Sequence, residues 1–401
     1  MSTNFIDFVV EKIAIIDLNW IGKIIQWLIN GIGIIGVGII VFTLIIKTVT
    51  MPLDVFSRVK MKKQSLIMKK MRPQMEKLQK QYANDKKMYS QKVMELQKAN
   101  GISMLASCLP MIVTLVIFMV VFGAFSTYSQ YVNLSMYNDM VDAYNASVQN
   151  YVGENGFLEE KTDESIGETS YLVMFDKFEE VSGISLDGKN EAQKMDEVRK
   201  FVRENARKKA ADHYRAHRSN FLWVNSLWYP DSMLNKEVPV FSKFSSSISR
   251  ATGTGINASY EASYNEVTYY LLNDGYPNEN GKIEGKAYNG YFVLIVLAIG
   301  LMFLQQFISM RAQKDANELG TVDGSAARTN KWMMILMPVI YGFFSFMYSA
   351  AFSLYMITSS VYSLVSTLII NKAMDVSFAK QEANGGYKLK SEKKNNRKRL
   401  K

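Results

Sequence analysis

Hydrophobic residues in this chain gather in long uninterrupted blocks rather than in the short periodic repeats of a soluble domain. Apolar runs cover residues 31–51, 102–127 and 291–310, and each reaches the roughly 20 residues that a helix needs to cross a bilayer. A fourth run, residues 331–370, is about twice that length, and the residues YSAAFS at 348–353 mark its middle. The pattern predicts five transmembrane helices, over residues 31–51, 102–127, 291–310, 332–348 and 353–371.

The fold class that follows is an all-α polytopic membrane protein with a cytoplasmic helical hairpin and a large extracytoplasmic loop domain of mixed α/β fold. The parts outside the spans are an amphipathic interfacial helix within residues 1–30, the hairpin at 52–101, the outer domain at 128–290, a cytoplasmic loop at 311–331 and a basic tail at 372–401. Within the outer domain, the charged stretch 190–218 predicts a helix, and EVTYYLL at 266–272 predicts a short strand.

The hairpin carries methionines at helical spacing in its first arm, and residues 84–85 mark its turn. Met68, Met71 and Met75 have two interpretations that stay open. They form an adaptable apolar surface for varied partners, or they pack one arm on the other. Pro73 is expected to kink or restart the first arm.

Charge is distributed unevenly between the polar segments. Residues 52–101 hold 13 Lys or Arg against 4 Asp or Glu, and residues 372–401 hold ten against three. The long region 128–290 holds 24 acidic against 17 basic residues. Because Lys and Arg accumulate on the cytoplasmic side of a membrane protein, we expect the N-terminus outside and the C-terminus inside.

The residue types that usually carry chemistry are scarce. Cys108 is the only cysteine, which excludes an intrachain disulfide, and His213 and His217 are the only histidines. We recognise no phosphate-cradling glycine loop and no nucleophile motif. The sequence therefore predicts no enzyme, no metal site and no cofactor.

Lys47 is the one ionisable residue well inside a predicted span, five residues before Pro52, which we expect to end that span. A cation at this depth is by default a functional candidate, because placing it in hydrocarbon costs a few kcal/mol. The alternative is that Lys47 extends its ammonium to the nearby interface. Both interpretations stay open.

Polar side chains occur in every span. They either join the helices to one another or face one hydrated cavity around Lys47. The candidates for such a cavity are Thr43, Thr50, Ser107, Gln305, Gln306, Tyr341, Tyr355 and Thr358.

The lysine-rich tail fits two anionic partners. It anchors the chain on anionic lipid, or it binds ribosomal RNA, with phosphate neutralisation supplying the affinity. DNA is not an expected partner.

Several stretches, in this order, resemble the YidC/Oxa/Alb membrane protein insertases. They are TLIIKTVTMPL at 43–53, MRPQMEKLQKQY at 71–82, MELQKANGISMLASCLPMIV at 94–113, FLWVNSLWYPD at 221–231 and LMPVIYGFFSFMYSAAFSLYMITSSVYS at 336–363. Lys47 takes the place of the arginine that family members carry five residues before a proline. Residues 128–215 and 240–290 look like insertions without a family counterpart.

The resemblance implies a protein of the bacterial plasma membrane that inserts newly made membrane proteins through a hydrophilic groove, without nucleotide or metal. Its implied partners are nascent membrane proteins, the ribosome (through the tail and the hairpin), the Sec translocon and anionic lipids. The alternative class is a membrane receptor or channel-like protein whose outer domain binds a ligand.

Overall fold

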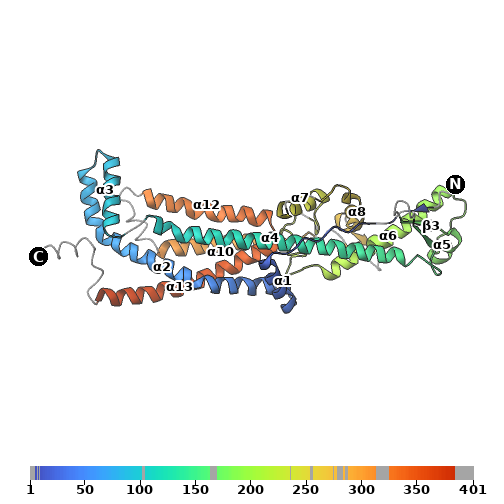
Figure 1. Cartoon of the computed structure of the whole chain (residues 1–401), viewed down its shortest axis with the longest axis horizontal. Helices are drawn as coiled ribbons and strands as arrows, with labels where there is room; N and C mark the ends of the chain where they lie inside the picture. The colour runs from blue at the N-terminus through green and yellow to red at the C-terminus, as the bar shows by residue number, and fades with distance from the viewer. Residues whose placement is uncertain are drawn as a thin grey trace. The chain divides into compact units, whose positions relative to one another are not determined.

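A computed structural model describes residues 5–6, 8, 10–101, 104–162, 169–234, 236–252, 256–273, 275–277, 283–284, 288–312 and 325–383 (Figure 1). The chain forms two compact units. We call them the outer unit, Met1–Trp27 with Ala124–Phe292, and the helical unit, Leu28–Gly123 with Val293–Lys401. Their limits fall close to the predicted ends of the outer domain.

The helical unit is built around two long helices, α2 (Ile35–Gln81) and α13 (Ala350–Ala383). Helix α13 packs along α2 and along α10 (Val293–Ala312), and α10 in turn packs along α12 (Ser325–Met347). A Cβ atom at Gly342 of α12 would lie 2.7 Å from the Ile299 side chain of α10. The glycine therefore permits this close approach.

Helix α2 continues through both of its prolines, so Pro52 does not end the helix, and the end of the first span at residue 51 stays a prediction. Pro73 does not restart the helix either. A proline removes one backbone hydrogen bond, but neighbouring contacts can hold a helix across it. Next to Pro52, the Met51 sulfur accepts a hydrogen bond from the Tyr362 hydroxyl at 3.5 Å. On either side of Pro73, the buried residues 71 and 75 pack against the returning arm.

The returning arm is α3 (Lys86–Ala99), which lies against the end of α2 (Figure 1). The Asp85 side chain accepts a hydrogen bond from the Met88 backbone N–H at 2.9 Å and caps α3. The predicted turn at residues 84–85 is confirmed.

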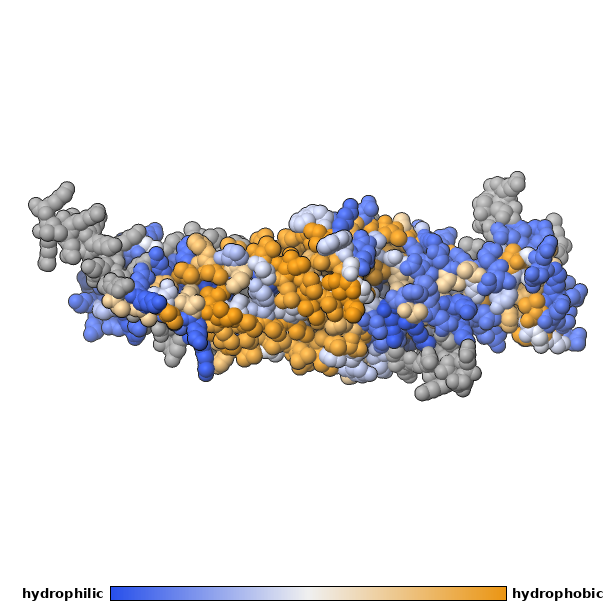
Figure 2. Space-filling model, turned by 90° about the horizontal axis from the view of Figure 1, so that it is seen from below, coloured by the Kyte–Doolittle hydropathy of each residue, from blue (hydrophilic) through white to orange (hydrophobic). Residues whose placement is uncertain are grey.

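Two described helices are long and apolar enough to cross a membrane, Ile35–Gln81 and Ala350–Gln381, and shorter apolar helices cover Val293–Ser309 and Pro338–Met347. The helix is interrupted at residues 348–349, and this short non-helical link separates α12 from α13, as the YSAAFS stretch predicts. Large apolar side chains of this unit face outward, among them Val49, Val296 and Ile369. Figure 2 shows hydrophobic residues gathered on the face of the helical unit where α2 and α13 lie. A lipid environment would cover such a surface.

The outer unit contains a three-stranded antiparallel sheet in the order β1-β3-β2. Its strands are β1 (Phe5–Ile6), β2 (Leu158–Thr162) and β3 (Thr169–Val173), with Phe5 opposite Leu172 and Leu158 opposite Val173. Two further strands, β4 (Tyr276–Pro277) and β5 (Ile283–Glu284), pair with each other.

Helices supply most of the core of the outer unit. The predicted helix at 190–218 is confirmed as α6 (Glu191–His217), which begins with a capping box between Asn190 and Gln193. Its buried residues recur at helical spacing, and Ala206 and Ala210 are fully buried. The core also takes residues from α4 (Met104–Gln149), α5 (Phe175–Ser182) and α7 (Phe241–Thr252).

Two predictions for this region differ from the structure. Helix α4 continues past residue 127 to Gln149, so the polar region starts within a helix. The strand predicted at 266–272 is helical, as α8 (Tyr260–Val267) and α9 (Tyr269–Leu272). The physical reason is periodicity. Tyr264, Val267 and Leu271 are buried at spacings of three and four, which is the helical repeat.

The segment in which an amphipathic helix is predicted, residues 1–30, contains most of α1 (Trp20–Ile32). The Asn19 side chain accepts a hydrogen bond from the Gly22 backbone N–H at 2.8 Å. Trp20 and Trp27 are 71% and 74% exposed. Such exposure is expected of tryptophans that lie among lipid headgroups. The interfacial position of α1 stays a prediction.

Candidate functional site

One face of α2 is polar and turned inward. Ile39 and Thr43 are fully buried on this face, and Lys47, Thr50 and Asp54 continue it at spacings of four, three and four residues, each half-buried. Such spacing keeps all five residues on one side of an α-helix. Lys47 therefore lies on the packed side of α2 and not on its fully exposed side.

Helix α13 carries a matching row of buried hydroxyl groups. Ser353, Ser360, Ser363 and Thr367 are between 0% and 8% exposed, at spacings of seven, three and four residues. Sequence reasoning did not place Ser353, Ser363 or Thr367 in the candidate set. Their helical spacing within one apolar run was the signal that could have identified them.

The hydroxyls on these two faces bond mostly to their own helices. Thr43 donates to the Ile39 carbonyl at 2.7 Å, Thr50 donates to that of Lys47 at 3.2 Å, and Thr367 donates to that of Ser363. Thr358, on another side of α13, likewise donates to the Leu354 carbonyl at 2.9 Å. These bonds satisfy the donors but leave oxygen lone pairs free to accept. The buried Ser353 hydroxyl has no hydrogen-bond partner among the described residues.

The remaining predicted groove residues lie in the same unit. Gln305 and Gln306 of α10 are half-buried. Tyr341 of α12 meets the Phe118 ring edge-on, with ring centroids 4.9 Å apart. Tyr355 of α13 is 5% exposed and forms a hydrogen bond with Ser359. Ser107 belongs to α4, but its side chain lies outside the described part.

The structure thus brings α2, α10, α12 and α13 side by side and turns polar groups of α2 and α13 into their packing. Thr43 and Tyr355 are more deeply buried than the groove prediction requires. Both would need a rearrangement of the helices before a bound segment could reach them.

The hairpin methionines divide into two groups. Met71 and Met75 are 0% and 1% exposed and form a cluster with Val93 of α3, whereas Met88 and Met94 are each 39% exposed. Met68 is partly buried against the cluster, and Pro73 is exposed. The structure places the predicted seam between the two arms, which favours packing for Met71 and Met75.

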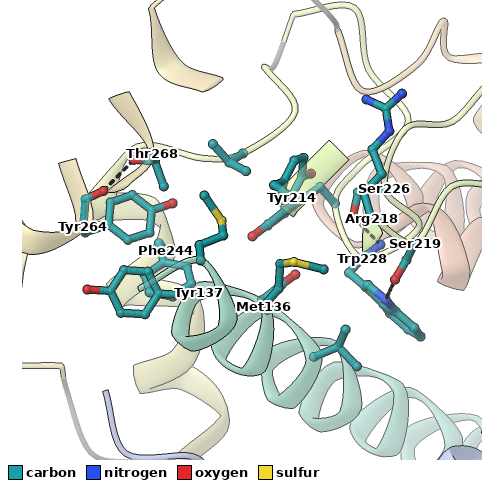
Figure 3. A pocket seen from close by; sticks show the side chains of 15 residues that line it. Met136, Tyr137, Tyr214, Arg218, Ser219, Ser226, Trp228, Phe244, Tyr264 and Thr268 are labelled. Atoms are coloured by element: carbon teal, nitrogen blue, oxygen red, sulfur yellow. Dashed lines mark hydrogen bonds between the residues drawn. The ribbon is translucent and has the colours of Figure 1, made fainter. Parts of the chain in front are cut away.

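The outer unit contains a small cavity, and six of the fifteen residues that line it are aromatic (Figure 3). Its free volume is about 20 Å³, which is room for about one water molecule. Two tyrosine hydroxyls around it are engaged in hydrogen bonds. Tyr214 donates to the Glu237 carbonyl at 3.1 Å, and Tyr264 donates to that of Pro239 at 2.7 Å. Burial raises the pKa of both phenols well above the usual value, so they remain neutral donors.

A buried amide joins two distant segments of the outer unit. The Asn289 side chain is fully buried and accepts a hydrogen bond from the Ser226 backbone N–H at 2.7 Å. Its amide nitrogen donates to the carbonyls of Ser226, Tyr229 and Pro230 at 2.8–3.0 Å. One side chain thereby satisfies the backbone of the turn at residues 226–230.

The next residue of that turn, Asp231, completes the junction. Its fully buried carboxylate accepts hydrogen bonds from the backbone N–H groups of Tyr291 and Phe292, at 2.7 and 3.1 Å. A Cβ atom at Gly290 would collide with this carboxylate, so glycine is required there. We call Asn289 and Asp231 together the polar latch. Sequence reasoning did not find it.

The comparisons with known proteins agree on one family. The model of the family described as 60Kd inner membrane protein matches residues 27–154 and 201–378, which is more than half of the chain. Among the curated relatives, a protein of Fusobacterium nucleatum named membrane protein insertase YidC is 39% identical over 92 residues, covering 23% of this chain and 43% of that protein. Proteins of the same name from Oceanobacillus iheyensis and Leptospira interrogans are 34% identical over 109 residues and 38% identical over 91.

These alignments cover 25% of this chain and 42% of the Oceanobacillus protein, and 23% and 14% for the Leptospira protein. The match thus spans less than half of each of these relatives. Apolar helices of crossing length, with polar side chains between them, define a helical membrane protein. The chain belongs to the 60Kd inner membrane protein family, the YidC/Oxa/Alb family.

The family match corrects the predicted insertions. It includes residues 240–290 and the two ends of 128–215, which are 128–154 and 201–215, and it leaves 155–200 unmatched between its two parts. The unmatched segment holds β2, β3, α5 and the start of α6.

Proposed function

We propose that this chain is a membrane protein insertase. The inward polar face of α2 and the hydroxyl row of α13 form the two walls of a hydrophilic groove. The polar flank of a nascent membrane segment rests there while its apolar part moves into lipid. The observation that carries the proposal is Lys47, half-buried on the same helix face as Thr43 and Thr50.

The physical basis is the cost of polar groups in hydrocarbon. Burying an unpaired polar group there costs about 2–7 kcal/mol, depending on the reference state. Oxygen lone pairs on α2 and α13 and the Lys47 ammonium offer partners partway across. A cation in a poorly hydrated site attracts acidic and polar flanks more strongly than one in water.

We further propose five crossings, an N-terminus outside the cell and a C-terminus in the cytoplasm. The hairpin formed by α2 and α3 would then face the cytoplasm with its 13 basic residues. Nascent chains, ribosomes, the Sec translocon and anionic lipids are the proposed partners. The cavity of the outer unit has room for about one water molecule, and it does not favour a ligand receptor.

The test is complementation in bacteria depleted of their own insertases, with protease accessibility of a substrate's outer tail as the readout. Lys47→Arg should retain insertion because it retains the charge. Lys47→Ala should reduce it at least tenfold for substrates with acidic tails, and Lys47→Glu should block it. Immunoblots of each variant control for protein level. Full activity of Lys47→Ala would contradict the groove and leave Lys47 as a residue that extends to the interface.

A further inference from the structure

One acidic residue of the hairpin region differs from the rest. Residues 52–101 contain four acidic side chains, and three of them have a direct structural role. Glu76 pairs with Arg72 at 3.0 Å, Glu95 pairs with Lys92 at 2.9 Å, and Asp85 caps α3. Asp54 is the fourth. It makes no direct ion pair with another residue that the structure describes, although the segment around it in the sequence is rich in Lys and Arg.

Asp54 lies on the inward polar face of α2. It follows Lys47 by seven residues and precedes Arg58 by four, which places all three charges on one side of the helix. Each is half-buried. Asp54 and Arg58 both interact electrostatically with Lys47. Neither Lys47 nor Arg58 makes a direct ion pair with another described residue. The three charges therefore influence one another through space, without a direct ion pair among the described residues.

The spacing sets the size of this influence. Seven residues of α-helix separate two positions by about 10 Å along the axis. Salt screens exposed charges over about that distance, but it screens half-buried charges less. A carboxylate at Asp54 thus weakens the attraction of Lys47 for an anion and provides its own attraction for a cation.

We propose that Asp54 determines the charge selectivity of the inward polar face. It limits the capture of strongly acidic flanks at Lys47, and it favours segments that bring a basic residue to the cytoplasmic end of the face. The ligand class is a cationic side chain of the incoming polypeptide. This proposal rests on the proposed insertase function, and it adds to it a second contact of opposite sign.

The experiment uses three single-span substrates that differ only in two residues of the flank, which are Glu, Gln or Lys. Each is inserted by the full-length chain, by Asp54→Asn, by the charge-retaining Asp54→Glu and by Glu76→Gln. The last variant is the matched control, since it removes a negative charge from an exposed position of the same helix. A second neutral variant, Asp54→Ser, covers the case in which Asp54→Asn does not accumulate.

Asp54→Asn and Asp54→Ser should raise the insertion ratio of the Glu substrate to the Lys substrate by about two- to tenfold, the range that one charge at this distance produces. Asp54→Glu and Glu76→Gln should leave the ratio within a factor of about two of the unaltered chain. An equal change for all three substrates, or the same ratio change with Glu76→Gln, would overturn the proposal. If the unaltered chain inserts none of the three, the proposed function fails, and the selectivity of Asp54 falls with it.

Discussion

The two units of this protein differ in the partners of several of their buried polar groups. In the outer unit, the polar latch joins segments about 60 positions apart. The Asn138 side chain donates to the Ile13 carbonyl at 2.8 Å and accepts from the Ile13 backbone N–H at 2.9 Å. In the helical unit, Thr43, Thr358 and Thr367 donate to the carbonyl four residues earlier in their own helix. The long-range hydrogen bonds of the outer unit hold distant segments in one fixed arrangement.

The arrangement in the helical unit leaves the contact between helices less specified. A hydroxyl that bonds back to its own helix satisfies its donor without tying it to a neighbour. Helices packed in this way can change partners at a lower energetic cost than segments joined by a buried network. This difference suits a rigid outer unit and a helical unit that admits a passing segment.

The largest effect should follow from breaking the polar latch. Asn289→Ala leaves the Ser226 N–H and the carbonyls of the same turn without a partner, and each orphaned buried group costs about 1–3 kcal/mol. We expect the outer unit to become sensitive to limited proteolysis at a much lower urea concentration. Asn273→Ala removes an exposed amide that bonds to its own helix, and it serves as the control. Equal protease resistance of the two variants would show that the latch does not hold the unit together.

A smaller effect is expected in the hairpin of the helical unit. Met71→Ser and Met75→Ser each remove a buried apolar side chain, for which related substitutions cost about 2–5 kcal/mol. Protease should then cut residues 57–100 faster, while the protein still integrates into the membrane. Met88→Ser and Met94→Ser, at half-exposed positions, should have little effect. If Met71→Ser abolishes insertion and leaves the hairpin protease-resistant, the methionines contact a partner instead.

The smallest effect concerns acid. Burial and the stacked His217, with ring centroids 4.3 Å away, lower the pKa of His213, and Asp139 and Asp142 oppose this shift. A histidine with a lowered pKa binds its proton more weakly when folded than when unfolded. Stability therefore falls as the pH drops below the ordinary value near 6.5. His213→Gln should flatten this decline in the urea midpoint of the outer unit between pH 7 and pH 5. An unchanged slope would assign the decline to other groups.

The sequence predicted the parts that follow from local pattern. Apolar length predicted the long helices, charge and helical spacing predicted α6, and the position of Asp85 predicted the start of α3. The inward face of α2 was also within reach, because Thr43, Lys47 and Thr50 repeat at helical spacing.

Other features depend on contacts that no local pattern reveals. Asn289 meets Ser226 only after the chain between them has folded, so its role could not be read from either segment alone. Residues 266–272 are rich in residues that favour strands, but burial of Tyr264, Val267 and Leu271 made them helical. Pro52 does not end α2 and Pro73 does not restart it, because a contact next to Pro52 and packing on both sides of Pro73 hold α2 continuous.

The central claim, that the polar flank of a substrate enters between the inward faces of α2 and α13, can be tested by disulfide cross-linking. Ser363→Cys is nearly isosteric and lies on the buried face of α13, whereas Val365→Cys lies on the outward face, 48% exposed. Both are made in a Cys108→Ser background and paired with one cysteine in the flank of a ribosome-stalled membrane segment. We predict a cross-link from position 363 that depends on the length of the stalled chain, and little from position 365. A cross-link from 365 alone would contradict the claim.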